Sequence, residues 1–103
     1  MPTNVKADVI RDHLVSVLAA WGMSAPHAQT TADMMVETDL RGVDSHGISM
    51  LPTYDREQRA GRLNLTPTFK TVREGPAFAL IDADASLGHP VSVHAMNLAV
   101  DKC

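Results

Sequence analysis

The chain has 103 residues, of which 45% are apolar, nine are Lys or Arg and twelve are Asp or Glu, so its formal net charge is −3. This composition is typical of a globular protein with one domain at most, and the absence of a basic cluster argues against a nucleic-acid partner. We expect no membrane span, because no apolar run is long enough, and no secretory signal between Met1 and Lys6. A single cysteine, Cys103, excludes an internal disulfide and favours the reducing cytoplasm.

The sequence up to Gly42 predicts a hairpin of two helices. Ser24 is a candidate cap for the second helix, and Pro26 follows where a first helical turn tolerates proline. The connection between the helices is short, so they should run antiparallel and share one buried face. In the first helix, apolar residues recur at intervals of three and four before Gly22: Val9, Ile10, Leu14, Val17, Leu18 and Trp21.

A polar segment with two glycines, residues 42–47, separates this hairpin from a third helical pattern. Ile48, Leu51 and Tyr54 have helical spacing, and the pattern ends near Gly61. Because proline disrupts a helix interior, the third helix either starts near Pro52 or is kinked there.

Two strands and a last helix are predicted for the remaining residues. Residues 69–73 alternate, a Gly-Pro pair follows, and residues 77–81 form a second run in which we expect Phe78 to be a core residue. A helical pattern begins at Pro90 and meets no terminating residue before Cys103, which predicts an interrupted helix. The predicted fold class is therefore α+β, with an N-terminal helical hairpin plus a third helix, then a β-hairpin and a truncated helix.

Three common cofactor and metal signatures are missing from the sequence. The six glycines are scattered singly, so neither a G-x-G-x-x-G nor a G-x-x-x-x-G-K-[ST] loop is present. No H-x-x-x-H pair occurs among the histidines, and we therefore predict no metal site. The five histidines are His13, His27, His46, His89 and His94.

The adjacent residues Ser45 and His46, between two glycines at a helix junction, are the candidate catalytic residues. Ser45 can cap the following helix while its hydroxyl stays near the imidazole, and Gly47 leaves the approach to His46 open. The positive end of a helix dipole disfavours imidazolium, which suits a residue that both gives and takes a proton. The alternative is that Ser45 is only a cap and His46 only a loop residue, since no orienting carboxylate follows from the spacing.

The segment DLRGVDSHGI at residues 39–48, with LPTY at 51–54 and AGR at 60–62, resembles the N-terminal segment of the malate/L-lactate dehydrogenase family of the non-Rossmann type. The resemblance extends over essentially the whole chain. It implies a fragment, inactive alone, of an oxidoreductase that transfers a hydride between NAD or NADP and a small 2-keto acid, 2-hydroxy acid or cyclic imino acid. It further implies that residues 1–65 form a helical substrate-side region and that residues 66–103 begin the cofactor-binding domain.

The same resemblance assigns roles to individual residues. His46 matches a histidine proposed as proton donor, Ser45 its partner in a proton relay, and Tyr54 a position that lines the substrate pocket. Many members have an arginine four residues after the histidine, which holds the substrate carboxylate, whereas this chain has Met50. Either Arg41, Arg56 or another arginine replaces it, or the substrate headgroup differs. The residues that bind the cofactor are unknown, and the family implies a homodimer with a small-molecule substrate.

A second hypothesis is a stand-alone helical interaction module without catalytic activity. The two hypotheses are distinguished by the reading frame after Cys103. Continuation into a cofactor-binding sequence favours the enzyme, whereas a stop codon and a stable oligomer without ligand favour the module.

Overall fold

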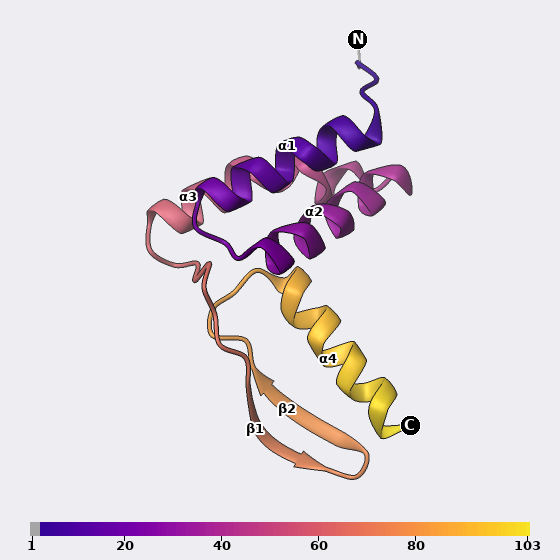
Figure 1. Ribbon diagram of the computed structural model, residues 1–103, viewed down its shortest axis with the longest axis vertical. Helices are drawn as coiled ribbons and strands as arrows, with labels where there is room; N and C mark the ends of the chain where they lie inside the picture. The colour runs from indigo at the N-terminus through magenta and orange to yellow at the C-terminus, as the bar shows by residue number, and fades with distance from the viewer. Residues whose placement is uncertain (1–2) are drawn as a thin grey trace.

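The structure, a computed structural model, describes residues 3–103. Its helical part contains α1 (Ala7–Ala20), α2 (Ala25–Leu40), two short 3-10 helices, η1 (Asp44–His46) and η2 (Ile48–Met50), and α3 (Leu51–Arg59). An antiparallel hairpin of β1 (Lys70–Gly75) and β2 (Phe78–Asp82) follows, and then α4 (Gly88–Lys102). Figure 1 shows the first three α-helices together at one end and the hairpin beside α4 at the other. The α+β class and the order of elements are confirmed.

The hairpin of α1 and α2 forms where the sequence predicts it. Gly22 follows α1 with φ of 104°, a conformation that glycine adopts without steric cost. The hydroxyl of Ser24 accepts a hydrogen bond from the N–H of His27 at 3.4 Å, and Pro26 lies in the first turn of α2. The sequence signals of this turn therefore act as predicted.

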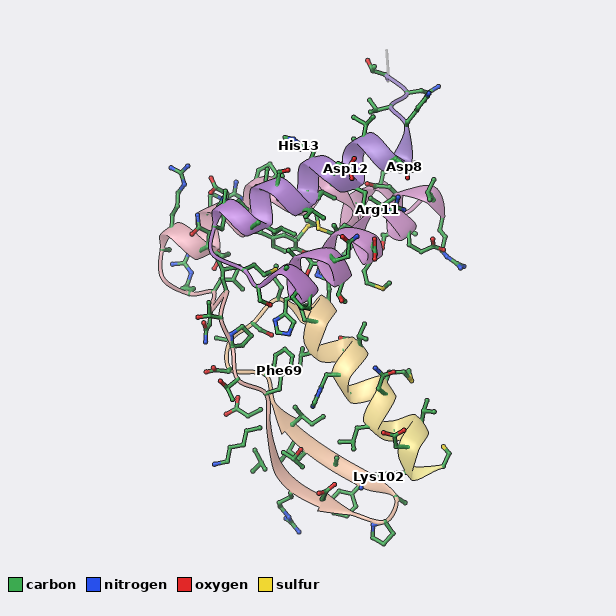
Figure 2. The ribbon with its side chains drawn as sticks, viewed as in Figure 1. Asp8, Arg11, Asp12, His13, Phe69 and Lys102 are labelled. Atoms are coloured by element: carbon green, nitrogen blue, oxygen red, sulfur yellow. The ribbon has the colours of Figure 1, made fainter. Side chains whose placement is uncertain are left out.

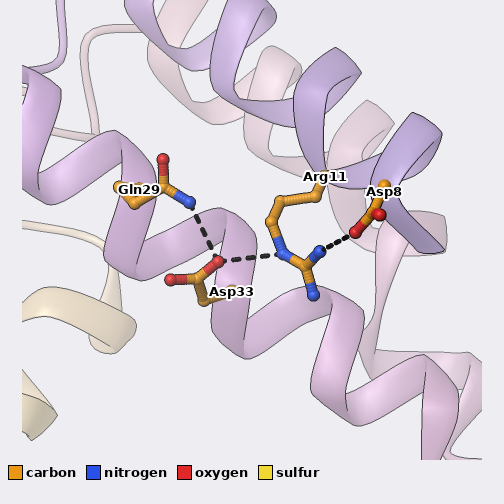
Figure 3. A network of polar contacts seen from close by, with 4 residues as sticks. All are labelled: Asp8, Arg11, Gln29 and Asp33. Atoms are coloured by element: carbon orange, nitrogen blue, oxygen red, sulfur yellow. Dashed lines mark hydrogen bonds and ion pairs between the residues drawn. The ribbon is translucent and has the colours of Figure 1, made fainter.

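Ion pairs on the surface connect the same two helices. Arg11 of α1 contacts Asp8 at 2.6 Å and Asp33 of α2 at 3.0 Å, and Gln29 donates to Asp33 at 2.9 Å (Figure 3). Because such exposed pairs contribute little to stability, the apolar face between the helices carries most of their association.

Two apolar clusters make up the core. The first surrounds Leu14 and Met35, and the second joins Leu18 of α1 to Leu87 before α4. Tyr54 of α3 packs against both clusters, so α3 shares its core with α1 and α2. The buried members of the two clusters are Leu14, Ala32, Met35 and Val36, and Leu18, Met23, Ala28 and Leu87.

Helix α3 starts at Leu51, with Pro52 in its first turn. The proline therefore marks a helix start and not a kink, since its missing N–H has no helical partner at that position. The preceding residues, 44–50, form two 3-10 helices where the sequence predicts only a turn and the start of a helix. Gly61, with φ of 74°, follows the end of α3 as predicted.

The prediction that Phe78 is a core residue is wrong, because its exposed fraction is 53%. Phe78 pairs with Gly75 across the hairpin, and its ring occupies the space that a Cβ at Gly75 would need. The ring therefore covers a glycine at the end of the strand pair. Lys102 connects α4 to the same end of the hairpin, with its ammonium 3.0 Å from Glu74 and 2.9 Å from the carbonyl of Gly75 (Figure 2).

Candidate active site

Ser45 and His46 contact each other in the loop between α2 and α3. The Ser45 Oγ lies 2.7 Å from the His46 Nδ1, which is a short hydrogen bond. Both residues are exposed. Because Nδ1 is occupied by the hydroxyl, Nε2 is the ring nitrogen that remains for a substrate atom. The pairing of hydroxyl and imidazole that the sequence suggests is therefore present.

The expectation that Ser45 caps the following helix is wrong. It is the second residue of η1, and neither η2 nor α3 has a side-chain cap. His46 is the last residue of η1 and precedes α3 by five positions, so the dipole of α3 does not act on it at close range. The hydroxyl of Ser45 bonds to the imidazole and not to a helix N-terminus.

The side chain of Asp39, and not that of Ser45, bonds to the backbone at the start of η2. Its carboxylate Oδ2 accepts a hydrogen bond from the N–H of Ile48 at 2.9 Å. Gly47 is buried, and a Cβ built on it would collide with the Asp39 carboxylate. Sequence reasoning missed this role because the contact joins residues on opposite sides of a loop. The available signal was an acidic residue in the last turn of α2, one of the positions in the family motif.

Tyr54 lies on α3 with its ring against both core clusters. Its ring meets that of His89 edge to face, with centroids 6.1 Å apart and an interplanar angle of 81°. Burial raises the pKa of Tyr54 and lowers the pKa of His89. Within residues 3–103, no hydrogen bond joins Tyr54 to Ser45 or His46, and the contacts that the structure shows for Tyr54 are packing contacts.

Met50 ends η2 and is half-buried. Of the two arginines considered as replacements, Arg41 is paired with Glu37 at 2.8 Å. Arg56 donates to the hydroxyl of Thr53 at 3.1 Å, and in the described part of the chain it has no carboxylate within ion-pair distance. Arg56 is therefore the one of these two arginines whose charge is not already paired.

Two cavities of the described residues offer no free cationic side chain to the phosphates of a nicotinamide dinucleotide. One cavity of about 430 Å³ is lined by Asp39 and Asp44 and by no basic side chain. A second, between β2 and α4, contains Lys102, but its ammonium is already bonded to Glu74 and Gly75. Among residues 3–103 there is also no group of three side chains that could hold a metal ion, and no helix long and apolar enough to cross a membrane.

Comparison with known proteins gives consistent matches over nearly the whole chain. Residues 5–103 match the family described as malate/L-lactate dehydrogenase. Malate dehydrogenase of Pyrococcus horikoshii is 41% identical over 98 residues, which are 95% of this chain and 27% of that protein. L-sulfolactate dehydrogenase of Methanocaldococcus jannaschii is 42% identical over 89 residues, or 86% of this chain and 26% of that protein. The solved structure of the M. jannaschii sulfolactate dehydrogenase has a TM-score of 0.93 at 39% identity, covering 95% of this chain and 28% of that one. The chain thus spans about a quarter of the length of these curated relatives.

Proposed function

Because the chain belongs to the malate/L-lactate dehydrogenase family, we propose that the complete protein is an oxidoreductase that transfers a hydride between NAD or NADP and a small 2-hydroxy or 2-keto acid, or a cyclic imino acid. Similarity to relatives named as dehydrogenases of malate and sulfolactate supports a 2-hydroxy acid. In this proposal residues 1–65 form the substrate side, residues 66–103 begin the cofactor-binding domain, and the enzyme is a homodimer.

The observation that carries the proposal is the 2.7 Å contact between Ser45 Oγ and His46 Nδ1 in an exposed loop. His46 gives a proton to the oxygen or nitrogen on C2 when the substrate is reduced, and takes it back when the product is oxidised. Ser45 orients the ring and connects its second nitrogen to a proton relay. Nε2 of the exposed residue His46 is the atom that meets the substrate.

Position 50 is a methionine in this chain, so an arginine at another position binds the substrate carboxylate. Arg56 is the candidate, because it is not paired with a carboxylate and a guanidinium binds carboxylates through two hydrogen bonds. Tyr54 contributes the wall of the substrate pocket. Since these two cavities offer no free cation to the cofactor phosphates, we assign no cofactor contact to residues 3–103 and propose that the 103-residue chain is inactive alone.

The test is the turnover of the complete protein with NADH or NADPH and either oxaloacetate or pyruvate. We expect His46→Ala to lower kcat by about two to four powers of ten, since a general acid contributes about 10² to 10⁴-fold. Ser45→Ala should lower kcat by about tenfold, because it removes one hydrogen bond to the imidazole. The matched control is His13→Ala, which removes an exposed histidine of α1 (Figure 2) and should leave kcat unchanged. Undiminished turnover in His46→Ala would contradict the assignment.

A further inference from the structure

We propose that Asp39 is a positioning residue for the Ser45 and His46 pair, acting through the backbone of Gly47 and Ile48. The inference rests on the proposed function, in which His46 transfers the proton. In this proposal Asp39 touches neither substrate nor cofactor. It holds in place the segment that carries Ser45 and His46.

The end of α2 holds the loop at both sides of the pair. Before it, the N–H of Val43 donates to the carbonyl of Thr38 at 3.0 Å. After it, the N–H of Ile48 donates to the Asp39 carboxylate at 2.9 Å. Residues 44–47 are therefore bracketed by two hydrogen bonds to neighbouring residues of one helical turn. Only the second of these bonds uses a side chain, so it is the one that a substitution can remove.

Gly47 and Asp39 fit each other sterically. A side chain at position 47 has no space, because a Cβ there would overlap the carboxylate of Asp39. Gly47 is buried, and the next side chain, Ile48, packs against the core cluster of Leu14 and Met35. The packing of Ile48 therefore keeps the backbone at Gly47 close to the Asp39 carboxylate.

This arrangement has a consequence for catalysis because His46 directly precedes Gly47. A shift of the backbone at Gly47 moves the imidazole and the Ser45 hydroxyl together relative to a bound substrate. A displacement of about 1 Å of a reacting group can lower the rate by about 100-fold. We therefore expect variants at Asp39 to lower kcat more than they raise KM.

The experiment compares four variants of the complete protein in the same turnover assay. Asp39→Ala should lower kcat by about 10 to 100-fold. Asp39→Asn should stay within about threefold of the parent, since an amide oxygen of the same shape still accepts the bond from Ile48. Gly47→Ala should be as impaired as Asp39→Ala, whereas Asp39→Ala with Gly47→Ala should be no worse than Asp39→Ala alone, because the collision is gone. Additive losses, or an Asn variant as slow as the Ala variant, would overturn the proposal.

The matched control is Glu37→Ala. It removes another carboxylate of the same helix, one that is paired only with Arg41 at the surface, and it should leave kcat unchanged. Circular dichroism of each variant distinguishes a variant that does not fold from one that folds with the loop of Ser45 and His46 displaced. If Asp39→Ala does not fold, the comparison of Gly47→Ala with Asp39→Asn and the parent still decides the question.

A readout without turnover separates failure of this inference from failure of the proposed function. The side-chain NMR signals of His46 report the hydrogen bond between Nδ1 and Ser45 Oγ. They should change in Asp39→Ala and Gly47→Ala and remain as in the parent in Asp39→Asn. If no dehydrogenase activity exists but these signals behave as expected, only the function fails. If His46→Ala abolishes turnover while Asp39→Ala alters neither turnover nor the His46 signals, only the positioning role fails.

Discussion

At the residue scale, the contact between Ser45 and His46 could be predicted from sequence because the two are neighbours, and any exposed loop lets adjacent side chains meet. The capping role of Ser45 could not, since it depends on where the helix starts. Two 3-10 helices precede Leu51, so Ser45 is too far from the first turn of α3. The contact of Asp39 with Ile48 spans nine positions and follows only from the path of the loop.

Met50 gives a prediction about substrate choice at a single position. It is half-buried and stands four residues after His46, where an arginine would carry a guanidinium for the substrate carboxylate. Because we propose that Arg56 already binds the substrate carboxylate, we expect Met50→Arg in the complete protein to leave the KM for pyruvate unchanged. Arg56→Ala should raise that KM by about tenfold, since a hydrogen bond to a charged group contributes about 1.5–3 kcal/mol.

Steady-state kinetics with Met50→Leu as the matched apolar control measure the effect. A KM that falls about tenfold in Met50→Arg would contradict the assignment of Arg56, because it would show that no cation yet holds the carboxylate. An unchanged KM in Arg56→Ala would contradict it as well.

At the element scale, the helices followed from sequence more closely than the hairpin did. Gly22, Gly42 and Gly61 all have positive φ and mark helix ends, a signal that depends on one residue alone. Phe78 was misassigned because a strand pattern does not reveal whether a second layer covers it. The strands also contain an irregularity between Thr71 and Arg73 that alternation does not predict.

The junction of α3 and α4 gives a prediction on pH. His89 lies in the first turn of α4 against the Tyr54 ring, with its Nδ1 buried and without a hydrogen-bond partner in the described residues. Burial lowers the pKa of His89 from its ordinary 6.5. The unfolded chain therefore takes up a proton at a higher pH than the folded chain does. Stability should fall as pH drops below about 6.5 and stop falling below the folded-state pKa.

Thermal unfolding of the parent and of His89→Phe, measured at pH 7.5 and pH 5.5, tests this effect. The Phe variant keeps a ring against Tyr54 but cannot take up the proton, so its Tm should fall less between the two pH values. His13→Phe serves as the control, since it removes an exposed histidine from α1. Equal losses of Tm in the parent and in His89→Phe would contradict the role of His89.

At the scale of the whole molecule, the chain is elongated. Its radius of gyration is 14.9 Å and its extents are 51 × 31 × 22 Å, whereas a compact domain of about 100 residues has a radius near 13 Å. The start of α1 and the end of α4 lie far apart along the longest axis of the molecule (Figure 1). Phe69 stands at the junction, with its ring 5.3 Å from that of His27 and 5.4 Å from that of His94 (Figure 2). Aromatic contacts thus join the helical part to the hairpin and α4.

Burial is distributed unevenly between these two parts, and this predicts unequal local stability. All four buried residues of the first core cluster and two of the four in the second lie in α1 and α2. In contrast, β1 and β2 contain no buried residue, and Pro90 is the buried residue of α4. Local opening costs least where few apolar contacts break. We therefore expect the backbone amides of residues 70–82 to exchange with deuterium at least about tenfold faster than those around Leu18 and Met35 in the 103-residue chain.

Hydrogen exchange followed by NMR measures each amide separately, so the two regions serve as internal references for each other. The amides of α1 exposed at its first turn lie outside the comparison, because helix ends fray whatever the core does. Exchange rates in the hairpin equal to those in the core of α1 and α2 would mean that the chain opens as one cooperative unit. In that case the contact of the Phe69 ring with His27 would couple the helical part to the hairpin and α4 far more strongly than one aromatic pair usually does.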